Sequence, residues 1–205
     1  MRIGIDFDNT IVGYDEVFLQ SAKRSGLLAP EFSGGKQAVR DALRRLPDGE
    51  RAWQRLQGLV YGGGISDAVM FEGVDKFLRR CLGEAHEVYI VSHKTEHGHF
   101  DATDVNLRAG ALGWMERHGF FRPDGYAIPV ECVFFEGSRA EKLKRIAVLD
   151  CTHFIDDLEE VLSDPRFPPI NRILFAPHHA PRAPLRYPAC ATWARIEAEV
   201  FRAAG

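Results

Sequence analysis

The chain opens with an alternation of apolar and polar positions. Residues 3, 5 and 7 are apolar, and glycine or aspartate stands between and after them, in the run Arg2-Ile3-Gly4-Ile5-Asp6-Phe7-Asp8-Asn9-Thr10. This period of two predicts a β-strand. Ionised carboxylates are costly to bury without partners. We therefore expect Asp6 and Asp8 where this strand leaves its sheet.

A helical stretch follows the first strand. Apolar residues recur at helical spacing near 15–25, 36–46 and 50–60, which predicts three short helices. Glycine and proline separate them, at Gly26, Pro47-Asp48-Gly49 and Gly62-Gly63-Gly64. The pattern therefore predicts a small helical insert over residues 13–70.

From about residue 73 strands and helices alternate. Strands are predicted at 87–91, 132–135, 153–155 and 172–175, helices near 74–82, 104–118, 138–149 and 190–203, and loops at 93–103 and 176–189. Such alternation implies right-handed crossovers and a mostly parallel sheet. With the first strand, this predicts an α/β fold: a Rossmann-like, doubly wound, five-stranded sheet made by residues 1–12 and 71–205.

Polar residues gather at one edge of the predicted sheet. In an open α/β sheet the carboxyl ends of the strands form the edge where ligands bind, and the residues expected there are Asp6, Asp8, Ser92, Lys142, Asp156 and Asp157. Residues 138–141 fit a capping box that opens a helix. This places Lys142 in the first turn, beside backbone N–H groups that favour anions. The chain thus predicts one charged pocket at this edge.

Each of these residues also has a purely structural interpretation. Asp6 and Asp8 can begin a polar turn, and the pair Asp156-Asp157 can cap the next helix. Lys142 can be a solvated helix residue, with Lys144 as a competitor for its place. The functional interpretation depends on all of them falling, in order, on the expected elements.

The chemistry of such a pocket follows from its charges. Four carboxylates that face one another repel, so the site requires a cation, and oxygen ligands suit Mg²⁺. A lysine, a serine hydroxyl and a helix N-terminus can hold a phosphate group beside it. One carboxylate can then be a covalent nucleophile, and a second one can donate a proton.

Composition narrows the class of protein. The chain has 205 residues, a formal net charge of −3 and 45% hydrophobic residues, which is typical of a soluble globular protein. The four cysteines are far apart, so we expect reduced thiols and neither zinc nor disulfides. We also expect no signal peptide and no membrane span. These features predict a cytoplasmic protein that acts on a small phosphorylated substrate, without nucleic acid or a membrane as partner, and they leave its oligomeric state open.

The order of the motifs resembles the haloacid dehalogenase superfamily. The first motif matches residues 6–11, the second Ser92, the third Lys142, and the fourth Asp156-Asp157 after the apolar segment 153–155. Dehalogenating members lack an acid at the place of Asp8, so its presence resembles the phosphatase and phosphotransferase branches. In such proteins an insert between the first two motifs acts as a cap, which is the place of residues 13–70.

The resemblance implies a role for each matched residue. Asp6 would attack phosphorus and form an aspartyl-phosphate, and Asp8 would protonate the leaving oxygen and then activate water. Ser92 would bind the transferring phosphoryl group. Lys142 would orient Asp6 and neutralise phosphate charge.

The resemblance also implies a magnesium site and further contacts. Mg²⁺ would be held by the Asp6 carboxylate, the Asp8 carbonyl and an acid of the last pair, for which we favour Asp157 over Asp156. Thr10 would hold the neighbourhood of Asp8 by hydrogen bonding. Asn9 and Thr10 belong to the same motif and are candidate contacts for the substrate.

The loop after Ser92 has two interpretations. It holds His93, Lys94, His97 and His99. It is either a solvated loop, or His93 and Lys94 contact the leaving group of the substrate. The pair His178-His179 is likewise either a loop or the rim of the pocket.

Three functions compete on this pattern. The first is a Mg²⁺-dependent phosphatase of a small phosphomonoester, either a sugar phosphate or a nucleoside monophosphate. The second is a phosphotransferase or mutase that uses the same site. The third is a non-catalytic, phosphate-responsive regulatory protein similar to a receiver domain, although there the lysine comes last, whereas here Asp156-Asp157 follows Lys142.

Overall fold

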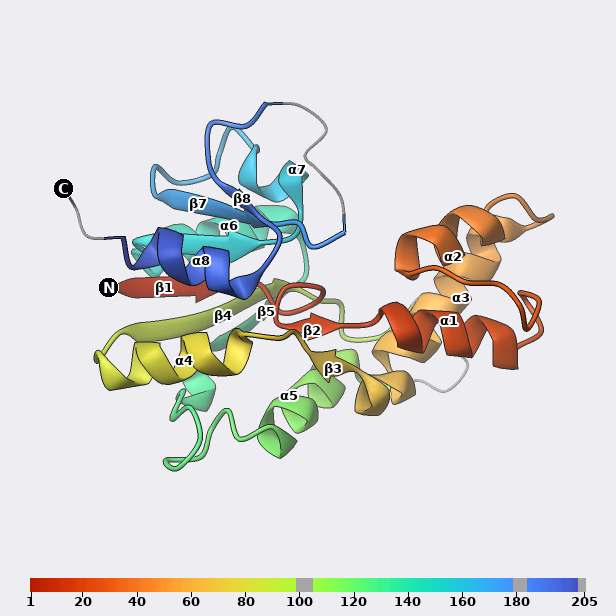
Figure 1. The fold of residues 1–205 in the computed structure, drawn as a ribbon, viewed down its shortest axis with the longest axis horizontal. Helices are drawn as coiled ribbons and strands as arrows, with labels where there is room; N and C mark the ends of the chain where they lie inside the picture. The colour runs from red at the N-terminus through yellow and green to blue at the C-terminus, as the bar shows by residue number, and fades with distance from the viewer. Residues whose placement is uncertain (99–104, 179–183, 203–205) are drawn as a thin grey trace. The chain divides into compact units, whose positions relative to one another are not determined.

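The computed structural model describes residues 1–98, 105–178 and 184–202, and these form two compact units. The first unit comprises residues 1–12, 70–94 and 118–205, and the second comprises 13–69 and 95–117. The first unit contains the central sheet, and the second is mainly helical (Figure 1).

Among the described residues, the sheet of the first unit has six strands in the order β5-β4-β1-β6-β7-β8. In chain order these are β1 (Arg2–Ile5), β4 (Glu87–His93), β5 (Val133–Glu136), β6 (His153–Asp156), β7 (Asn171–Phe175) and β8 (Ala189–Cys190). All neighbouring pairs are parallel, and Ile5 lies between Ile90 and Ile155 in the central register. The predicted α/β class with a mostly parallel, Rossmann-like sheet is therefore confirmed.

The predicted number of five strands is wrong, because β8 adds a sixth. This strand has two residues and pairs with the end of β7, with Ala189 opposite Leu174 and Cys190 opposite Phe175. Two residues are too few to show an alternation of apolar and polar positions. Residues 176–189 were predicted as a loop and 190 as the start of a helix, so the strand falls where the two predictions meet.

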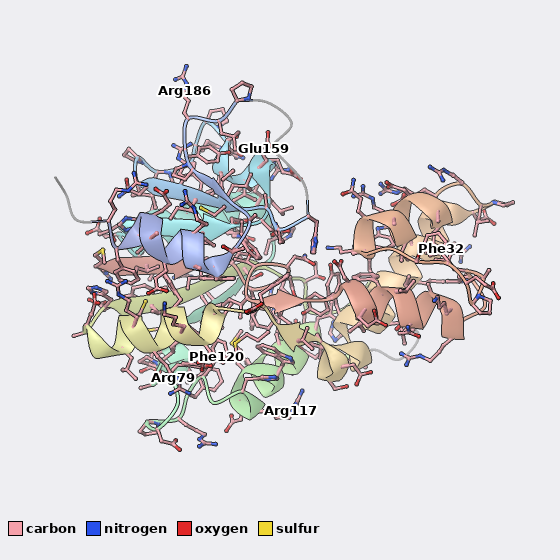
Figure 2. The ribbon with its side chains drawn as sticks, viewed as in Figure 1. Phe32, Arg79, Arg117, Phe120, Glu159 and Arg186 are labelled. Atoms are coloured by element: carbon pink, nitrogen blue, oxygen red, sulfur yellow. The ribbon has the colours of Figure 1, made fainter. Side chains whose placement is uncertain are left out.

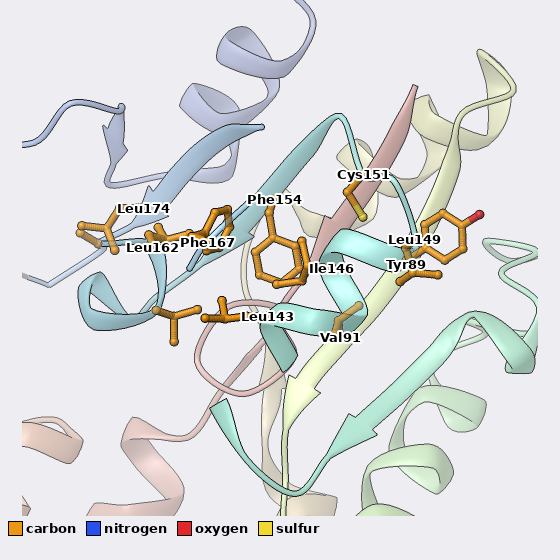
Figure 3. Packing of buried hydrophobic residues seen from close by; sticks show 12 residues of the cluster. Tyr89, Val91, Leu143, Ile146, Leu149, Cys151, Phe154, Leu162, Phe167 and Leu174 are labelled. Carbon is orange, nitrogen blue, oxygen red and sulfur yellow. The ribbon is translucent and has the colours of Figure 1, made fainter. Parts of the chain in front are cut away.

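One face of the sheet packs on α6 (Arg139–Val148) and α7 (Glu159–Leu162). Figure 3 shows the apolar cluster on this face, in which Val91 and Phe154 from the strands meet Leu143 and Ile146 from α6. Gly4 allows Phe154 to approach β1, since a Cβ atom on Gly4 would lie 2.4 Å from Cδ2 of that ring. The cluster therefore fixes α6, and with it the start of that helix, against the central strands.

The other face carries α4 (Val74–Gly83) and α8 (Trp193–Val200). The rings of Phe77 and Trp193 lie 5.1 Å apart, and Phe175 of β7 also packs on Trp193. The indole Nε1 of Trp193 donates a hydrogen bond to the carbonyl oxygen of Thr10 at 3.1 Å. Helices on both faces confirm the doubly wound layout, and Trp193 ties α8 to the turn that follows β1.

The segment after residue 117 packs on α4. The Tyr126 hydroxyl donates to Asp75 at 2.8 Å, the Arg79 guanidinium lies over the Tyr126 ring, and Phe120 meets that ring edge to face. Figure 2 labels Arg79 and Phe120 on this part of the first unit. A short 3₁₀ turn, η2 (Val130–Cys132), then leads into β5.

The second unit is built from α1 (Asp15–Arg24), α2 (Lys36–Leu43), α3 (Gly49–Tyr61), the 3₁₀ helix η1 (Gly63–Asp67) and α5 (Leu107–Arg117). Its interior is aromatic: Phe18 stacks on Trp53, and Tyr61 meets Tyr14 and Phe18 edge to face. Two short strands, β2 (Val12–Gly13) and β3 (Val69–Met70), pair with each other, and the boundary between the units falls within both.

The predicted division of the chain needs one correction. Residues 71–205 were expected to belong wholly to the core, but 95–117 belong to the second unit. The Trp114 indole is buried there and donates to the carbonyl oxygen of Ala68 at 2.9 Å. Periodicity predicted the helix correctly but could not show which element its apolar face covers.

All four cysteines are free thiols, and Cys81, Cys151 and Cys190 are buried. Burial raises the pKa of Cys81 to about 12 and that of Cys151 to about 11. Within the described part of the chain, none of the helices combines the length and apolar character that a membrane crossing requires.

Candidate active site

The first strand delivers Asp6 to the carboxyl edge of the sheet. The Asp6 amide still donates to the carbonyl oxygen of Ile155 at 2.9 Å, and the residue is buried. The Phe7 carbonyl then accepts hydrogen bonds from the amides of residues 10, 11 and 12, which closes a tight turn. Asn9 has a φ of 60° in this turn, a left-handed conformation that asparagine tolerates well. The turn therefore gives Asn9 a structural role, and its contact with a substrate stays a prediction.

Lys142 lies at the centre of the site. Its helix begins as predicted, because the Ser138 side chain caps it by accepting from the Glu141 amide. The Lys142 ammonium lies 2.6 Å from a carboxylate oxygen of Asp6 and 2.6 Å from one of Asp156. The side chains of all three are at most 7% exposed. The residue that follows β1, the last residue of β6 and a residue of α6 therefore form one buried ionic cluster.

The charged groups in this cluster shift each other's pKa values. Burial alone would lower the pKa of Lys142, but the Asp156 and Asp6 carboxylates outweigh it and hold the pKa above its ordinary value. Burial raises the pKa of Asp156 to about 6, against the opposing charge of Lys142. Lys142 is therefore a cation across the physiological range, and the pocket holds more carboxylates than ammonium charge.

Three carboxylates in the cluster meet the requirements of a cation site. Asp6, Asp156 and Asp157 each offer an oxygen atom, and these atoms lie within 4.8 Å of one another. One oxygen of Asp156 accepts from Lys142 and the other from the Leu158 amide at 2.8 Å. An all-oxygen set of this kind fits a hard divalent cation such as Mg²⁺.

Thr10 contributes to the same set of acids. Its hydroxyl is fully buried and lies 3.5 Å from an Asp157 carboxylate oxygen, to which it donates. The sequence suggested that Thr10 acts near Asp8 or on the substrate. The described contact of the hydroxyl is with Asp157, and a role of Thr10 near Asp8 or on the substrate stays a prediction.

A second ion pair involves Asp8 and Lys94. The Lys94 ammonium lies 2.7 Å from one oxygen of the Asp8 carboxylate and 3.1 Å from the other. The Lys94 side chain is 3% exposed and that of Asp8 is 16% exposed. The predicted polar loop therefore begins with a buried lysine that is held on an acid of the first motif.

Ser92 and His93 end β4 on opposite sides of the strand. Ser92 is buried, two residues beyond the Ile90 position that pairs with Ile5. His93 is exposed, and its Nε2 atom lies 3.2 Å from the carbonyl oxygen of Gly137, in the turn before α6. The structure thus brings Ser92 to the carboxyl edge and pairs His93 with backbone.

Two of the remaining predicted histidines, His97 and His178, belong to the described residues. His97 belongs to the second unit, where its carbonyl accepts from the Thr95 hydroxyl at 2.9 Å. His178 is exposed. His99 and His179 lie outside the described residues.

Comparison with known proteins gives a result at the level of structure. No protein-family model matches the chain, and no curated protein matches it. A haloacid dehalogenase-like hydrolase from Streptococcus pneumoniae aligns over 97% of both chains with a TM-score of 0.59 at 14% identity. Protein Tyrosine Kinase A from Mycobacterium tuberculosis aligns over 97% of this chain and 96% of its own, with a TM-score of 0.62 at 13% identity. A family hydrolase from Deinococcus radiodurans, solved with phosphate and sodium, aligns over 97% and 94% with a TM-score of 0.54 at 14% identity.

This chain has the haloacid dehalogenase-like fold. The resemblance that the motifs suggested is thus confirmed for the fold. Within this haloacid dehalogenase-like fold, Asp6 and Asp156 come from neighbouring central strands, and Lys142 comes from the helix that packs behind them.

Sequence reasoning missed one contact in this site, the ion pair between Lys94 and Asp8. Lys94 was predicted to contact a leaving group, but no feature of the sequence showed that its ammonium would meet Asp8. A lysine two positions after a strand-end serine was the only signal. The partner depends on how closely the ends of β1 and β4 approach, which a one-dimensional pattern does not contain.

Proposed function

We propose that this protein is a Mg²⁺-dependent phosphatase that hydrolyses a small phosphomonoester through an aspartyl-phosphate on Asp6. The observation that carries the proposal is the buried Lys142 ammonium between Asp6 and Asp156, at the edge where Asp157 and Asp8 also lie. Structural ion pairs rarely concentrate so many acids in one buried place, because desolvating them is costly.

The carboxylate of Asp6 is placed to attack phosphorus. In the first step an Asp6 oxygen forms a bond to phosphorus, the bond to the substrate oxygen breaks, and Asp8 gives that oxygen a proton. In the second step a water oxygen attacks the phosphorus of the aspartyl-phosphate, Asp8 takes a proton from this water, and inorganic phosphate leaves. Asp6 and Asp8 return to their starting states.

Lys142 and Ser92 prepare Asp6 and the phosphoryl group. The Lys142 ammonium holds one Asp6 oxygen, which fixes the carboxylate and reduces its repulsion of an anionic phosphate. Ser92 offers a hydroxyl donor at the same edge. These two residues therefore bind and orient the reacting groups and offset their charge while the bond to phosphorus forms.

We assign the cation to Asp6, the Asp8 carbonyl and Asp157. When bound, Mg²⁺ supplies positive charge that offsets the phosphate oxygens and the crowded acids. Both oxygens of Asp156 already accept hydrogen bonds from Lys142 and Leu158. This supports Asp157 as the direct ligand and Asp156 as the residue that orients Lys142.

The similar structures support this chemistry only by analogy. The Deinococcus radiodurans hydrolase was solved with bound phosphate and sodium, so its fold can hold an anion together with a cation. The second unit falls between the first two motifs for most of its length, and we assign it the role of a cap that selects a sugar phosphate or a nucleoside monophosphate.

A second candidate is phosphoryl transfer to an acceptor other than water. One of the similar structures is described as a protein tyrosine kinase. The same aspartyl-phosphate would then pass its phosphoryl group to a hydroxyl. Product analysis separates the two, because only hydrolysis releases inorganic phosphate in proportion to substrate consumed.

The test is phosphate release from a panel of sugar phosphates, nucleoside monophosphates and p-nitrophenyl phosphate, with Mg²⁺ and with EDTA. We expect activity that EDTA removes and that Asp6→Asn lowers by at least about 1,000-fold. Asp124→Asn, at an exposed aspartate of the first unit, is the matched control and should keep wild-type activity. Full activity in Asp6→Asn would overturn the assignment of the nucleophile.

A further inference from the structure

Lys94 is fixed at the carboxyl edge by its backbone as well as by its ammonium. It follows directly on β4, and its amide donates to the carbonyl oxygen of Glu136 at 3.0 Å, which extends the pairing with β5. Its ammonium lies within 3.1 Å of both oxygens of Asp8. The Phe7 ring, 5.9 Å from the ammonium, borders the pair.

The two buried lysines of the site divide the acids between them. Lys142 contacts Asp6 and Asp156, whereas Lys94 contacts Asp8. A lysine buried to this degree is costly unless it is paired. The contacts of its ammonium at 2.7 and 3.1 Å indicate that Lys94 holds both oxygens of the Asp8 carboxylate in place.

We propose that Lys94 is a positioning residue that fixes the Asp8 carboxyl group for its transfer of a proton to the leaving oxygen. This inference rests on the proposed function and adds a residue to it. A protonated carboxyl group keeps one O–H donor and lone-pair sites that accept, so Asp8 can accept from the Lys94 ammonium while its O–H donates to the leaving oxygen. Without Lys94, the Asp8 side chain can rotate between several staggered orientations, only some of which reach the substrate.

The geometry sets this role apart from a contact with the substrate. A lysine that binds the phosphate or leaving group contributes to substrate affinity, and its loss raises KM. A lysine that orients the proton donor contributes to the rate of leaving-group release. That contribution is largest for an alkyl leaving group, which needs a proton, and smallest for p-nitrophenolate, which leaves without one.

The experiment measures single-turnover release of the leaving group by rapid quench, with the whole protein and saturating Mg²⁺. The substrates are an alkyl phosphomonoester that the panel above shows to be turned over and p-nitrophenyl phosphate. For Lys94→Met we expect release of the alkyl group to slow by about 10- to 100-fold, with KM changed by less than about 3-fold. Release of p-nitrophenolate should slow by less than about 3-fold.

Further variants support the comparison. Lys94→Arg keeps a cation and should recover part of the lost rate, and Lys144→Met, at an exposed lysine of α6, should behave as wild type. Thermal unfolding shows whether Lys94→Met is folded. If it is not, Lys94→Gln takes its place. In the Asp8→Asn background, Lys94→Met should have almost no additional effect, since the group that it orients is gone.

Other outcomes overturn the inference. A raised KM with an unchanged rate of release would make Lys94 a substrate-binding residue, and equal slowing for both leaving groups would exclude the positioning of a proton donor. Wild-type behaviour of Lys94→Met and Lys94→Gln would exclude any role. An inactive wild type would overturn the proposed function and this inference with it, whereas an active wild type confines a failure to Lys94.

Discussion

The two edges of the central sheet hold charges in opposite ways. At the amino edge, Arg2 and Glu87 pair at 3.6 Å with side chains that are 37% and 62% exposed. At the carboxyl edge, Lys142 pairs with Asp6 and Asp156 at 2.6 Å, away from solvent. The first strand runs from one arrangement to the other within five residues.

The difference in burial between the two edges indicates how much each ion pair contributes to the free energy of unfolding. Exposed pairs are worth about 0–1 kcal/mol, because water and salt screen them. A buried pair is rarely worth more than well-packed apolar residues, yet removing one partner costs about 3–5 kcal/mol, since the other charge is left unpaired. The carboxyl edge is therefore an expensive arrangement that stability alone does not explain.

The largest effect is expected from Lys142→Met. It leaves Asp6 and Asp156 buried without their cation, so we expect a loss of about 3–5 kcal/mol in the free energy of unfolding, together with loss of phosphatase activity. Urea unfolding measures the stability. Lys144→Met on the same helix is the control, and equal stability of the two variants would refute the buried cluster.

A second prediction concerns the pH dependence of the metal-free protein. Burial raises the pKa of Asp156 to about 6 from an ordinary 3.8, so between these values the folded state binds more protons than the unfolded chain. The stability of wild type relative to Asp156→Asn should therefore fall as pH rises from 4 to 7. Urea unfolding in EDTA across this range measures the difference, and a flat or rising difference would contradict the shift.

A third prediction concerns the cation itself. A ligand that binds only the folded state at 100 times its Kd stabilises it by about 2.7 kcal/mol. We expect Mg²⁺ to raise the melting temperature of wild type and to have little effect on Asp157→Asn. Asp164→Asn, outside the cluster, serves as the comparison, and an equal Mg²⁺ response in all three proteins would place the cation elsewhere.

The smallest effect is expected at the amino edge. Arg2→Gln and Glu87→Gln should each change the free energy of unfolding by less than about 1 kcal/mol and leave kcat unchanged. A double-mutant cycle gives the coupling between the two charges. A coupling energy between Arg2 and Glu87 as large as the loss expected for Lys142→Met would contradict the contrast between the two edges.

Much of this arrangement could be predicted from the sequence. The alternation in residues 2–8 and the capping box at 138–141 are local signals, and parallel topology brings their ends to one edge. The acids of the first and last motifs and Lys142 therefore met as expected. These features could be predicted because the local pattern of each segment agrees with the fold of the whole chain.

The features that the sequence did not predict depend on contacts between residues that are far apart in the chain. The strand β8 is too short to show a period, and the apolar face of α5 fits a partner in either unit. The contact between Lys94 and Asp8 joins residues 86 positions apart. Such pairings depend on how strand ends and loops pack, which no local pattern encodes.

One measurement tests the central claim directly: a crystal structure of the protein soaked with Mn²⁺ and beryllium fluoride, with the anomalous signal used to locate the metal. We predict Mn²⁺ bound by the carboxylates of Asp6 and Asp157, with beryllium fluoride attached to the Asp6 oxygen that Lys142 does not hold. Manganese bound away from these acids, or beryllium fluoride absent from Asp6 at full Mn²⁺ occupancy, would contradict it.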